Sequence, residues 1–362
     1  MTLARQCQPL LDILRDPRGM ATLDLKSWDL LLRQAGAAGL LSRLAVLAEM
    51  LGLSNRVPDA VKPHLTAARS VATKQRQAVR WEARRVARAL ADIDGPVLLL
   101  KGAAYAIADL PPAAGRLFGD IDILVPRAQL DQAEAALMLA GWHTQKQDDY
   151  DQRYYRRWMH ELPPMTHIRR GTVLDVHHNL LPETARIRTT ADPILDAAQA
   201  LADPTGLYIP ADTDLVLHSA CHLFHEGEWD HGLRDLVDLD AMLRAFAKSS
   251  AFWPALLARA QLLNLGRPLY YALDCCRRWL HTPIPDDVIA ACPSRPPAWQ
   301  RPLMRSLFDA GLASVHPTCR GRFARLATFI LFVRGHYLRM PWHLLLPHLL
   351  HQALRRNQEQ NR

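Results

Sequence analysis

The sequence has 362 residues, of which 49% are apolar and 22% charged, and 44 Lys and Arg residues against 36 Asp and Glu residues give a formal net charge of +8. This composition supports a sizeable buried core and excludes a disordered chain, while 17 Gly and 25 Pro residues exclude collagen-like or low-complexity material. The positive charge lies at one end, because the eight Arg and one Glu of residues 319–362 sum to +7. The rest of the chain is therefore close to neutral.

The cysteines and the apolar runs predict the compartment. The six Cys residues include no CxxC pair, which argues against a zinc ribbon, and scattered thiols indicate a reducing compartment. Asp12 and Arg15 interrupt the first apolar run, so we expect no signal peptide. The longest apolar run, residues 326–333, is far shorter than the ~18 residues of a membrane span. We therefore expect a cytoplasmic protein that meets a membrane at most peripherally.

Residues 1–93 have the apolar periodicity of helices. Leucines recur at helical spacing over residues 28–35 and 40–47. Residues 65–94 contain neither Gly nor Pro and are rich in Ala, Arg, Gln and Glu, which predicts one long helix. The sequence therefore predicts an N-terminal helical region.

The pattern changes at residue 94. Short apolar runs predict strands at residues 96–100, 119–125 and 172–177, and helices are predicted up to Leu110 and over residues 127–140. Alternation of strand and helix indicates an α/β unit. We assign the core domain to residues 94–210.

Helical patterns return at Asp212. One helix begins there, a second covers residues 233–243, and the prolines between residues 283 and 297 separate further helices. We expect residues 211–362 to form a C-terminal helical region that ends in the basic tail.

Three carboxylates stand on the predicted strands. Asp120 and Asp122 are two residues apart, so both side chains leave one face of their strand, and Asp175 lies on another strand. If these strands are neighbours, repulsion and desolvation among the three carboxylates cost several kcal/mol. A divalent cation offsets this cost, and carboxylate oxygens suit Mg²⁺, with Mn²⁺ as the alternative. Two such ions can clamp the attacking and leaving oxygens of an in-line displacement.

The turn at Lys101 and Gly102 predicts a phosphate site. A strand that ends at Gly and opens into a helix directs backbone N–H groups and a positive helix end at an anion. Lys101 and Arg116 add positive charge against a triphosphate. The predicted nucleotide-binding residues are Lys101, Gly102, Arg116 and Gly119.

These motifs resemble a known family. Lys101-Gly102, Arg116 and GDIDILV resemble the DNA polymerase β-type nucleotidyltransferase superfamily, and with HELPPM and LDVHHNL the sequence is similar to bacterial nucleotidyltransferase family 5. The resemblance implies an α+β fold, with a mixed sheet and helices in the core and helical regions on both flanks. It implies a nucleotidyltransferase (EC 2.7.7-type) that moves a nucleoside monophosphate from an NTP, expected to be ATP, to an acceptor hydroxyl.

The resemblance also implies catalytic roles. Asp120 and Asp122 would hold the nucleotide-bound metal, and Asp175 would complete a second metal site and help to deprotonate the acceptor. His177 lies on the same strand face as Asp175 and either orients that carboxylate or touches the acceptor, and the loop at residues 160–161 borders the site. The predicted acceptor-side residues are His177, His160 and Arg234.

Ala103 and Ala104 depart from the family pattern, which has Ser or Gly after the motif Gly. Without that hydroxyl, phosphate binding relies on backbone N–H groups, Lys101 and Arg116. Two alternatives stay open: a catalytically weak nucleotide-binding or antitoxin-like partner, and a phosphotransferase on the same scaffold. The acceptor also stays open among a small molecule, a peptide or protein side chain, and an RNA end.

Histidines and an Arg–Asp group mark the C-terminal region. His218, His222 and His225 share one helix face, which suits either a metal site or a cleft-lining and core role. Arg234 either forms ion pairs with the nearby Asp235 and Asp238 or contacts substrate.

The tail, residues 319–362, mixes arginines with aromatic side chains. It fits a packed helical element, a basic surface for RNA or another phosphate-rich partner, or an amphipathic segment on an anionic membrane. The aromatic residues concerned are Phe323, Phe329, Phe332, Tyr337 and Trp342.

Overall fold

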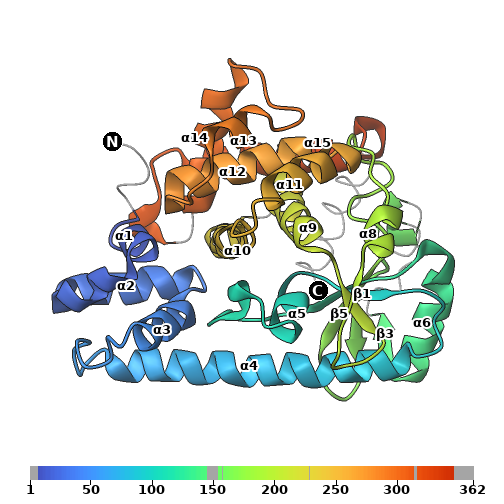
Figure 1. Ribbon diagram of the computed structural model, residues 1–362, viewed down its shortest axis with the longest axis horizontal. Helices are drawn as coiled ribbons and strands as arrows, with labels where there is room; N and C mark the ends of the chain where they lie inside the picture. The colour runs from blue at the N-terminus through green and yellow to red at the C-terminus, as the bar shows by residue number, and fades with distance from the viewer. Residues whose placement is uncertain (1–6, 145–153, 157, 228, 314–315, 346–362) are drawn as a thin grey trace, which may run out of the picture.

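The structure is a computed structural model that describes residues 7–144, 154–156, 158–227, 229–313 and 316–345. These residues form an α+β fold with one mixed sheet flanked by helices, as expected from the family resemblance (Figure 1). The division into three regions at residues 94 and 211 stays a prediction. Buried apolar side chains form one continuous cluster from Cys7 to Leu331, so the regions share a core.

The N-terminal helices precede the sheet. The long helix predicted from residue 65 is α4, which starts three residues earlier, with Pro63 in its first turn, and ends at Ala89. It runs along the lower edge of the molecule in Figure 1, and Arg76 and Arg80 on it pair with Asp109 beyond α5. The N-terminal helices are α1 (Leu10–Arg15), α2 (Leu25–Ala37), α3 (Leu41–Met50) and α4 (Lys62–Ala89).

The sheet has the strand order β3-β4-β5-β2-β1-β7-β6. The three strands predicted from the sequence are confirmed as β1, β2 and β5 at its centre. β1 and β2 are buried throughout, and β5 buries Leu174, Val176 and His177. The other four strands were not predicted. The strands are β1 (Val97–Leu99), β2 (Ile121–Leu124), β3 (Trp142–Thr144), β4 (Met165–His167), β5 (Val173–His177), β6 (Gln199–Ala200) and β7 (Leu207–Ile209).

The sheet is mixed, so the alternating strand and helix pattern is not a parallel α/β unit. β1 and β2 pair antiparallel, because α5 (Lys101–Ile107) ends before Pro111-Pro112 and the chain then turns back along β1. β2 and β5 pair parallel, as do β1 and β7. The predicted helix after β2 is confirmed as α6 (Leu130–Leu139).

Helices of the C-terminal region lie on the opposite side of α5 from α4 (Figure 1). The two predicted helices are confirmed as α9 and α10, whose first turns carry acidic residues that suit a helix N-terminus. The later helices are α8 (Asp192–Asp196), α9 (Asp212–His225), α10 (Gly232–Phe246), α11 (Phe252–Leu262), α12 (Gly266–Leu280), α13 (Asp286–Ala290), α14 (Gln300–Leu312) and α15 (Ala324–Arg339).

The basic tail begins as helix α15, which packs through one face only. Ala324, Ala327, Leu331 and Gly335 are buried in that face. Phe329, in contrast, is 61% exposed, and the part of the tail at residues 346–362 lies outside the described residues. Apolar side chains are also exposed at Phe323, Leu326, Ile330, Phe332, Val333, Tyr337 and Trp342. Within the described residues, no helix has both the length and the apolar character that crossing a membrane requires.

Candidate active site

The three predicted carboxylates meet at one place. β2 and β5 run parallel in a register that sets Asp122 directly beside Asp175, and Asp120 precedes β2 on the same side. One carboxylate oxygen from each of the three residues lies within 4.8 Å of the others. The convergence expected from the spacing is therefore confirmed.

Asp122 is buried in the middle of β2 and needs charged partners. Lys101 Nζ donates to its Oδ1 over 3.1 Å, and His177 Nε2 lies 3.2 Å from the same oxygen. Burial alone would raise the pKa of Asp122, but the Lys101 ammonium and His177 lower it more, so the net shift is well below the ordinary value. Asp122 is thus held as a carboxylate.

Asp175 lacks such partners. Its Oδ1 is buried without a hydrogen-bond partner among the described residues. Burial, together with the negative charges of Asp122 and Glu161, raises the pKa of Asp175 to about 7. A buried oxygen with free lone pairs beside two further carboxylates is the donor set that a hard divalent cation prefers. The three residues therefore fit a divalent metal.

The turn between β1 and α5 is strained at Lys101, whose φ of 44° lies in the left-handed region. Leu100 N donates to Asp122 O over 2.9 Å, which ties this turn to β2. A Cβ on Gly102 would lie 2.5 Å from Arg116 Nη1, so the glycine makes room for the guanidinium. No such contact exists at Gly119, where a Cβ would meet open space.

Carboxylates of the protein itself already pair with the Arg116 guanidinium. Its Nε donates to Asp238 Oδ2 over 2.7 Å, and Nη2 lies 3.9 Å from Asp235. Burial lowers the pKa of Arg116, but Asp238 and Asp235 raise it more, so the guanidinium stays charged. Arg43 on α3 also reaches Asp238, at 3.5 Å. This buried network joins α3, the segment before β2, and α10.

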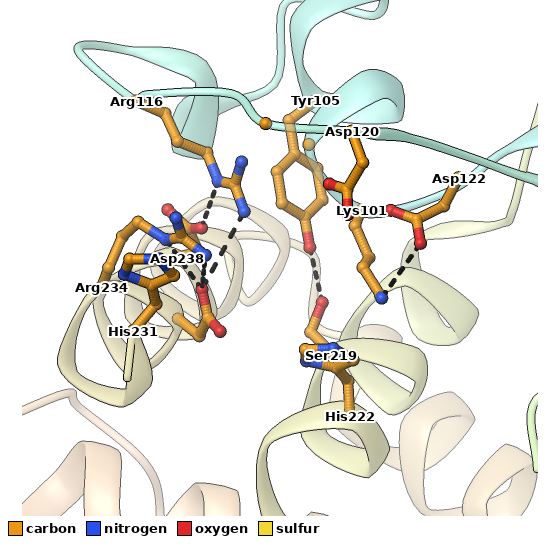
Figure 2. A pocket seen from close by; sticks show the side chains of 13 residues that line it. Lys101, Tyr105, Arg116, Asp120, Asp122, Ser219, His222, His231, Arg234 and Asp238 are labelled. Atoms are coloured by element: carbon orange, nitrogen blue, oxygen red, sulfur yellow. Dashed lines mark hydrogen bonds and ion pairs between the residues drawn. The ribbon is translucent and has the colours of Figure 1, made fainter. Parts of the chain in front are cut away.

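A cavity of about 270 Å³ opens beside the carboxylates. It lies between the segment that runs from α5 to β2 and the helices α9 and α10. Figure 2 shows Lys101, Asp120 and Asp122 at one end and Arg116 with the residues of α10 at the other. Tyr105 lies between the two ends and hydrogen-bonds Ser219 over 2.5 Å. The lining residues are Lys101, Gly102, Tyr105, Arg116, Gly119, Asp120, Asp122, Ser219, His222, His231, Arg234, Asp235 and Asp238.

The cavity contains all four predicted nucleotide-binding residues and Arg234, but it separates Arg234 from the other predicted acceptor-side residues. Arg234 pairs with Asp235 at 2.9 Å, as one of the two interpretations expected. Tyr105, Ser219 and His231 were not predicted as lining residues. Tyr105 lies on α5, one helical turn after Lys101, so its spacing from the phosphate motif was a local signal that could have identified it. No local motif marks Ser219 and His231, because α9 and the start of α10 reach the cavity only through tertiary packing.

His160 and His177 are not among the residues that line the cavity, although His177 contacts Asp122, which does line it. Glu161 forms an antiparallel bridge with His177, so residues 160–161 lie next to the strand that carries Asp175. The hydrogen bond of His177 goes to Asp122, so the expectation that it orients Asp175 is corrected to Asp122. The i+2 spacing from Asp175 did not reveal this contact, because it crosses between two strands.

The histidine row on α9 is not a metal site among the described residues. His218 and His225 are buried in the helix packing, while His222 lines the cavity and pairs with Glu226 at 3.3 Å. The metal-capable groups in the described part of the chain do not include the three histidines together. The cleft-lining and core interpretation is therefore the correct one.

Comparison with known proteins agrees with the geometry. A family model described as "Uncharacterised nucleotidyltransferase" matches residues 24–281, a span that includes the three carboxylates, the cavity and the segment at residues 160–177. No curated protein matches the sequence.

Proposed function

Because the chain belongs to the family of uncharacterised nucleotidyltransferases, we propose that it transfers a nucleoside monophosphate from an NTP to an acceptor hydroxyl, with Mg²⁺ as cofactor and pyrophosphate as leaving group. The observation that carries this proposal is the convergence of Asp120, Asp122 and Asp175 within 4.8 Å beside a cavity lined by Lys101. ATP is the proposed nucleotide, Mn²⁺ the alternative ion, and the cytoplasm the proposed location.

The three carboxylates would hold the metal, which would neutralise phosphate charge and align the displacement when bound. Asp122 is kept ionised by Lys101 and His177 and so presents a full negative charge. Asp175 has an oxygen without a hydrogen-bond partner among the described residues. This carboxylate takes the proton of the acceptor hydroxyl as the new O–P bond forms.

The cavity, whose lining does not include His177, supports binding of the nucleotide. Lys101 and Arg116 bring two positive charges to its wall, and Gly119, beside which a Cβ would meet open space, leaves the backbone accessible. Arg234 faces the same cavity and so fits the nucleotide better than the acceptor. His160 and His177 stay on the proposed acceptor side, where their burial favours orienting Asp122 over touching the acceptor.

The proposed reaction is tested by following which labelled phosphate of the NTP reaches the product. Purified protein is incubated with Mg²⁺ and NTPs labelled at the α- or γ-phosphate, and candidate acceptors are supplied as small-molecule, protein and RNA fractions. We expect α-label in the product and release of pyrophosphate, both absent in Asp122→Asn. Asp109→Asn, which changes an exposed carboxylate outside the cavity, is the matched control and keeps full activity.

The same experiment separates the two alternatives. Transfer of γ-label identifies a phosphotransferase. Tight Mg²⁺-dependent NTP binding without transfer to any fraction identifies the non-catalytic partner, an alternative that Ala103 favours because the phosphate site lacks a hydroxyl. Absence of Mg²⁺-dependent NTP binding contradicts all three proposals.

The exposed face of α15 favours the membrane interpretation of the basic tail. Its aromatic and aliphatic side chains are 40–67% exposed, and residues 319–345 carry arginines without any Asp or Glu. Such a face suits the boundary between acyl chains and anionic headgroups. Sedimentation with anionic vesicles, lost with neutral vesicles and in Phe329→Glu, supports this partner. Equal binding to both vesicle types, or salt-sensitive binding to RNA alone, contradicts it.

A further inference from the structure

A second group of metal-ligating side chains lies next to Asp122 and is not part of the cavity lining. His160, Glu161 and His177 each present one donor atom, and these atoms lie within 4.8 Å of one another. His160 is 6% and His177 5% exposed, and the Glu161 side chain is 19% exposed. The group is therefore shielded from water and is not a chance cluster of surface charges.

The backbone fixes this group as an extension of the sheet. Glu161 bridges His177 in antiparallel fashion. His178 N donates to His160 O over 2.8 Å, and Leu162 N donates to Val176 O over 2.9 Å. These two hydrogen bonds, one on each side of the bridge, hold the three residues on one rigid element, as a preformed metal site requires.

The hydrogen bonds orient His177 as a metal ligand is oriented. Its Nε2 faces Asp122 Oδ1 at 3.2 Å, and its Nδ1 faces Glu161 Oε2 at 3.3 Å. Histidines that bind metal usually donate their second ring N–H to a carboxylate, which fixes the ring and its tautomer. Asp122 is such a carboxylate, and with Nε2 bound to it the other ring nitrogen, Nδ1, faces Glu161.

His160 supplies an independent indication. Its Nδ1 is buried without a hydrogen-bond partner among the described residues. Leaving a buried polar atom unpaired costs about 1–3 kcal/mol. A ligand bound to this nitrogen would remove that cost. Its ring lies 5.2 Å from the His177 ring, centroid to centroid.

We propose that His160, Glu161 and His177 bind a borderline transition-metal cation of the Zn²⁺ class. Two imidazole nitrogens and one carboxylate oxygen form a donor set that Zn²⁺ accepts and that Mg²⁺, which prefers oxygen ligands alone, does not. Binding requires neutral imidazoles, so the proton between His177 Nδ1 and Glu161 leaves to solvent. This site is distinct from the three aspartates and does not depend on nucleotidyl transfer.

An ion at this place would also fix Asp122. The imidazole of His177 would link the ion to the carboxylate, so His177 is a positioning residue for the site on the cavity side. Replacement of Asp122 should in turn weaken binding of the ion, because removal of an outer hydrogen-bond partner costs roughly 10–100-fold in metal affinity.

The experiment measures binding of Zn²⁺ and not turnover. Chelator-treated full-length protein in excess Mg²⁺ is titrated with Zn²⁺ by calorimetry, and bound zinc is counted after gel filtration. We expect one Zn²⁺ per chain, and a loss of affinity beyond about 100-fold in His160→Ala and Glu161→Gln. The matched control is His178→Ala, which removes the neighbouring imidazole outside the group.

Three results would overturn the proposal. One is the absence of stoichiometric Zn²⁺ in the wild-type protein. Another is unchanged Zn²⁺ affinity in Glu161→Gln, which is isosteric and decides the question if His160→Ala unfolds. A third is loss of Zn²⁺ in Asp120→Asn with retention in Glu161→Gln, which would place the ion on the aspartates.

Discussion

Replacing Asp175 with Asn tests whether the carboxylates form a metal site at a cost to stability. The substitution keeps the shape of the side chain and removes one negative charge. In the metal-free protein, burial and the charges of Asp122 and Glu161 raise the pKa of Asp175 to about 7, far above the ~3.9 of an unfolded chain. The folded state therefore opposes ionisation of this group.

The magnitude follows from linkage. Between about pH 4 and pH 7 folded Asp175 holds a proton that the unfolded chain releases, so the free energy of unfolding falls as the pH rises through this range. A shift of about three units corresponds to roughly 4 kcal/mol above pH 7. Solvent reaches part of the Asp175 side chain, so this value is an upper bound.

Urea unfolding at pH 8 measures this cost directly. With EDTA present, we expect Asp175→Asn to be more stable than the wild-type protein, by up to about 4 kcal/mol. Mg²⁺ in place of EDTA should stabilise the wild-type protein much more than the variant, because a bound ligand stabilises only the state that binds it. The more stable variant should be the inactive one.

Asp235→Asn is the matched control. Asp235 lies in the same cavity, but although burial raises its pKa, Arg234, His222 and Arg116 lower it more, so its loss should destabilise the protein. The reasoning is refuted if Asp175→Asn destabilises the metal-free protein as Asp235→Asn does. It is also refuted if Mg²⁺ stabilises the wild-type protein and Asp175→Asn equally.

Three further predictions concern the surroundings of the cavity. Gly102→Ala places a Cβ 2.5 Å from Arg116 Nη1 and should cost about 1–3 kcal/mol in urea unfolding, less when Arg116 is also Ala. Asp238→Ala leaves Arg116 buried without its closest partner and should cost about 3–5 kcal/mol, against less than about 1 kcal/mol for Asp109→Asn, which weakens exposed ion pairs at a left-handed position that Asn tolerates. Burial lowers the pKa of His225 to about 4, so the unfolded chain takes up a proton first and the melting temperature should fall between about pH 6.5 and pH 4. His225→Gln should reduce this fall in melting temperature. An unchanged slope of melting temperature against pH would contradict the link to His225.

The central strands and the carboxylates could be predicted because their signals are local. β1 is buried throughout and carries an uninterrupted apolar run, while in β2 and β5 apolar residues flank Asp122 and Asp175. The spacing of Asp120 and Asp122 fixes their common face whatever the rest of the fold does. Only the register that sets Asp122 beside Asp175 required the structure.

Three of the remaining strands, namely β3, β4 and β6, and the long-range contacts have no local signal, while β7 is an apolar run of only three residues. β6 spans two residues, both exposed, and β3 and β4 carry only one and two buried residues, so no apolar run marks them. Arg116 and Asp238 are 122 residues apart in sequence, and their ion pair depends on how α10 packs against the core. Long-range pairing of this kind is set by topology, which periodicity does not encode.

Two unfavourable features of the site argue for catalysis over a non-catalytic binding role. Lys101 adopts a left-handed conformation that costs roughly 1–2 kcal/mol for a residue with a side chain, and Oδ1 of Asp175 is buried without a hydrogen-bond partner among the described residues. The first sets Lys101 Nζ on Asp122, and the second keeps a carboxylate oxygen open beside it. A scaffold that only bound a nucleotide could replace Asp175 by Asn and gain stability. Retention of this charge is explained if it is needed to bind metal and accept a proton, because active sites commonly sacrifice stability for such groups.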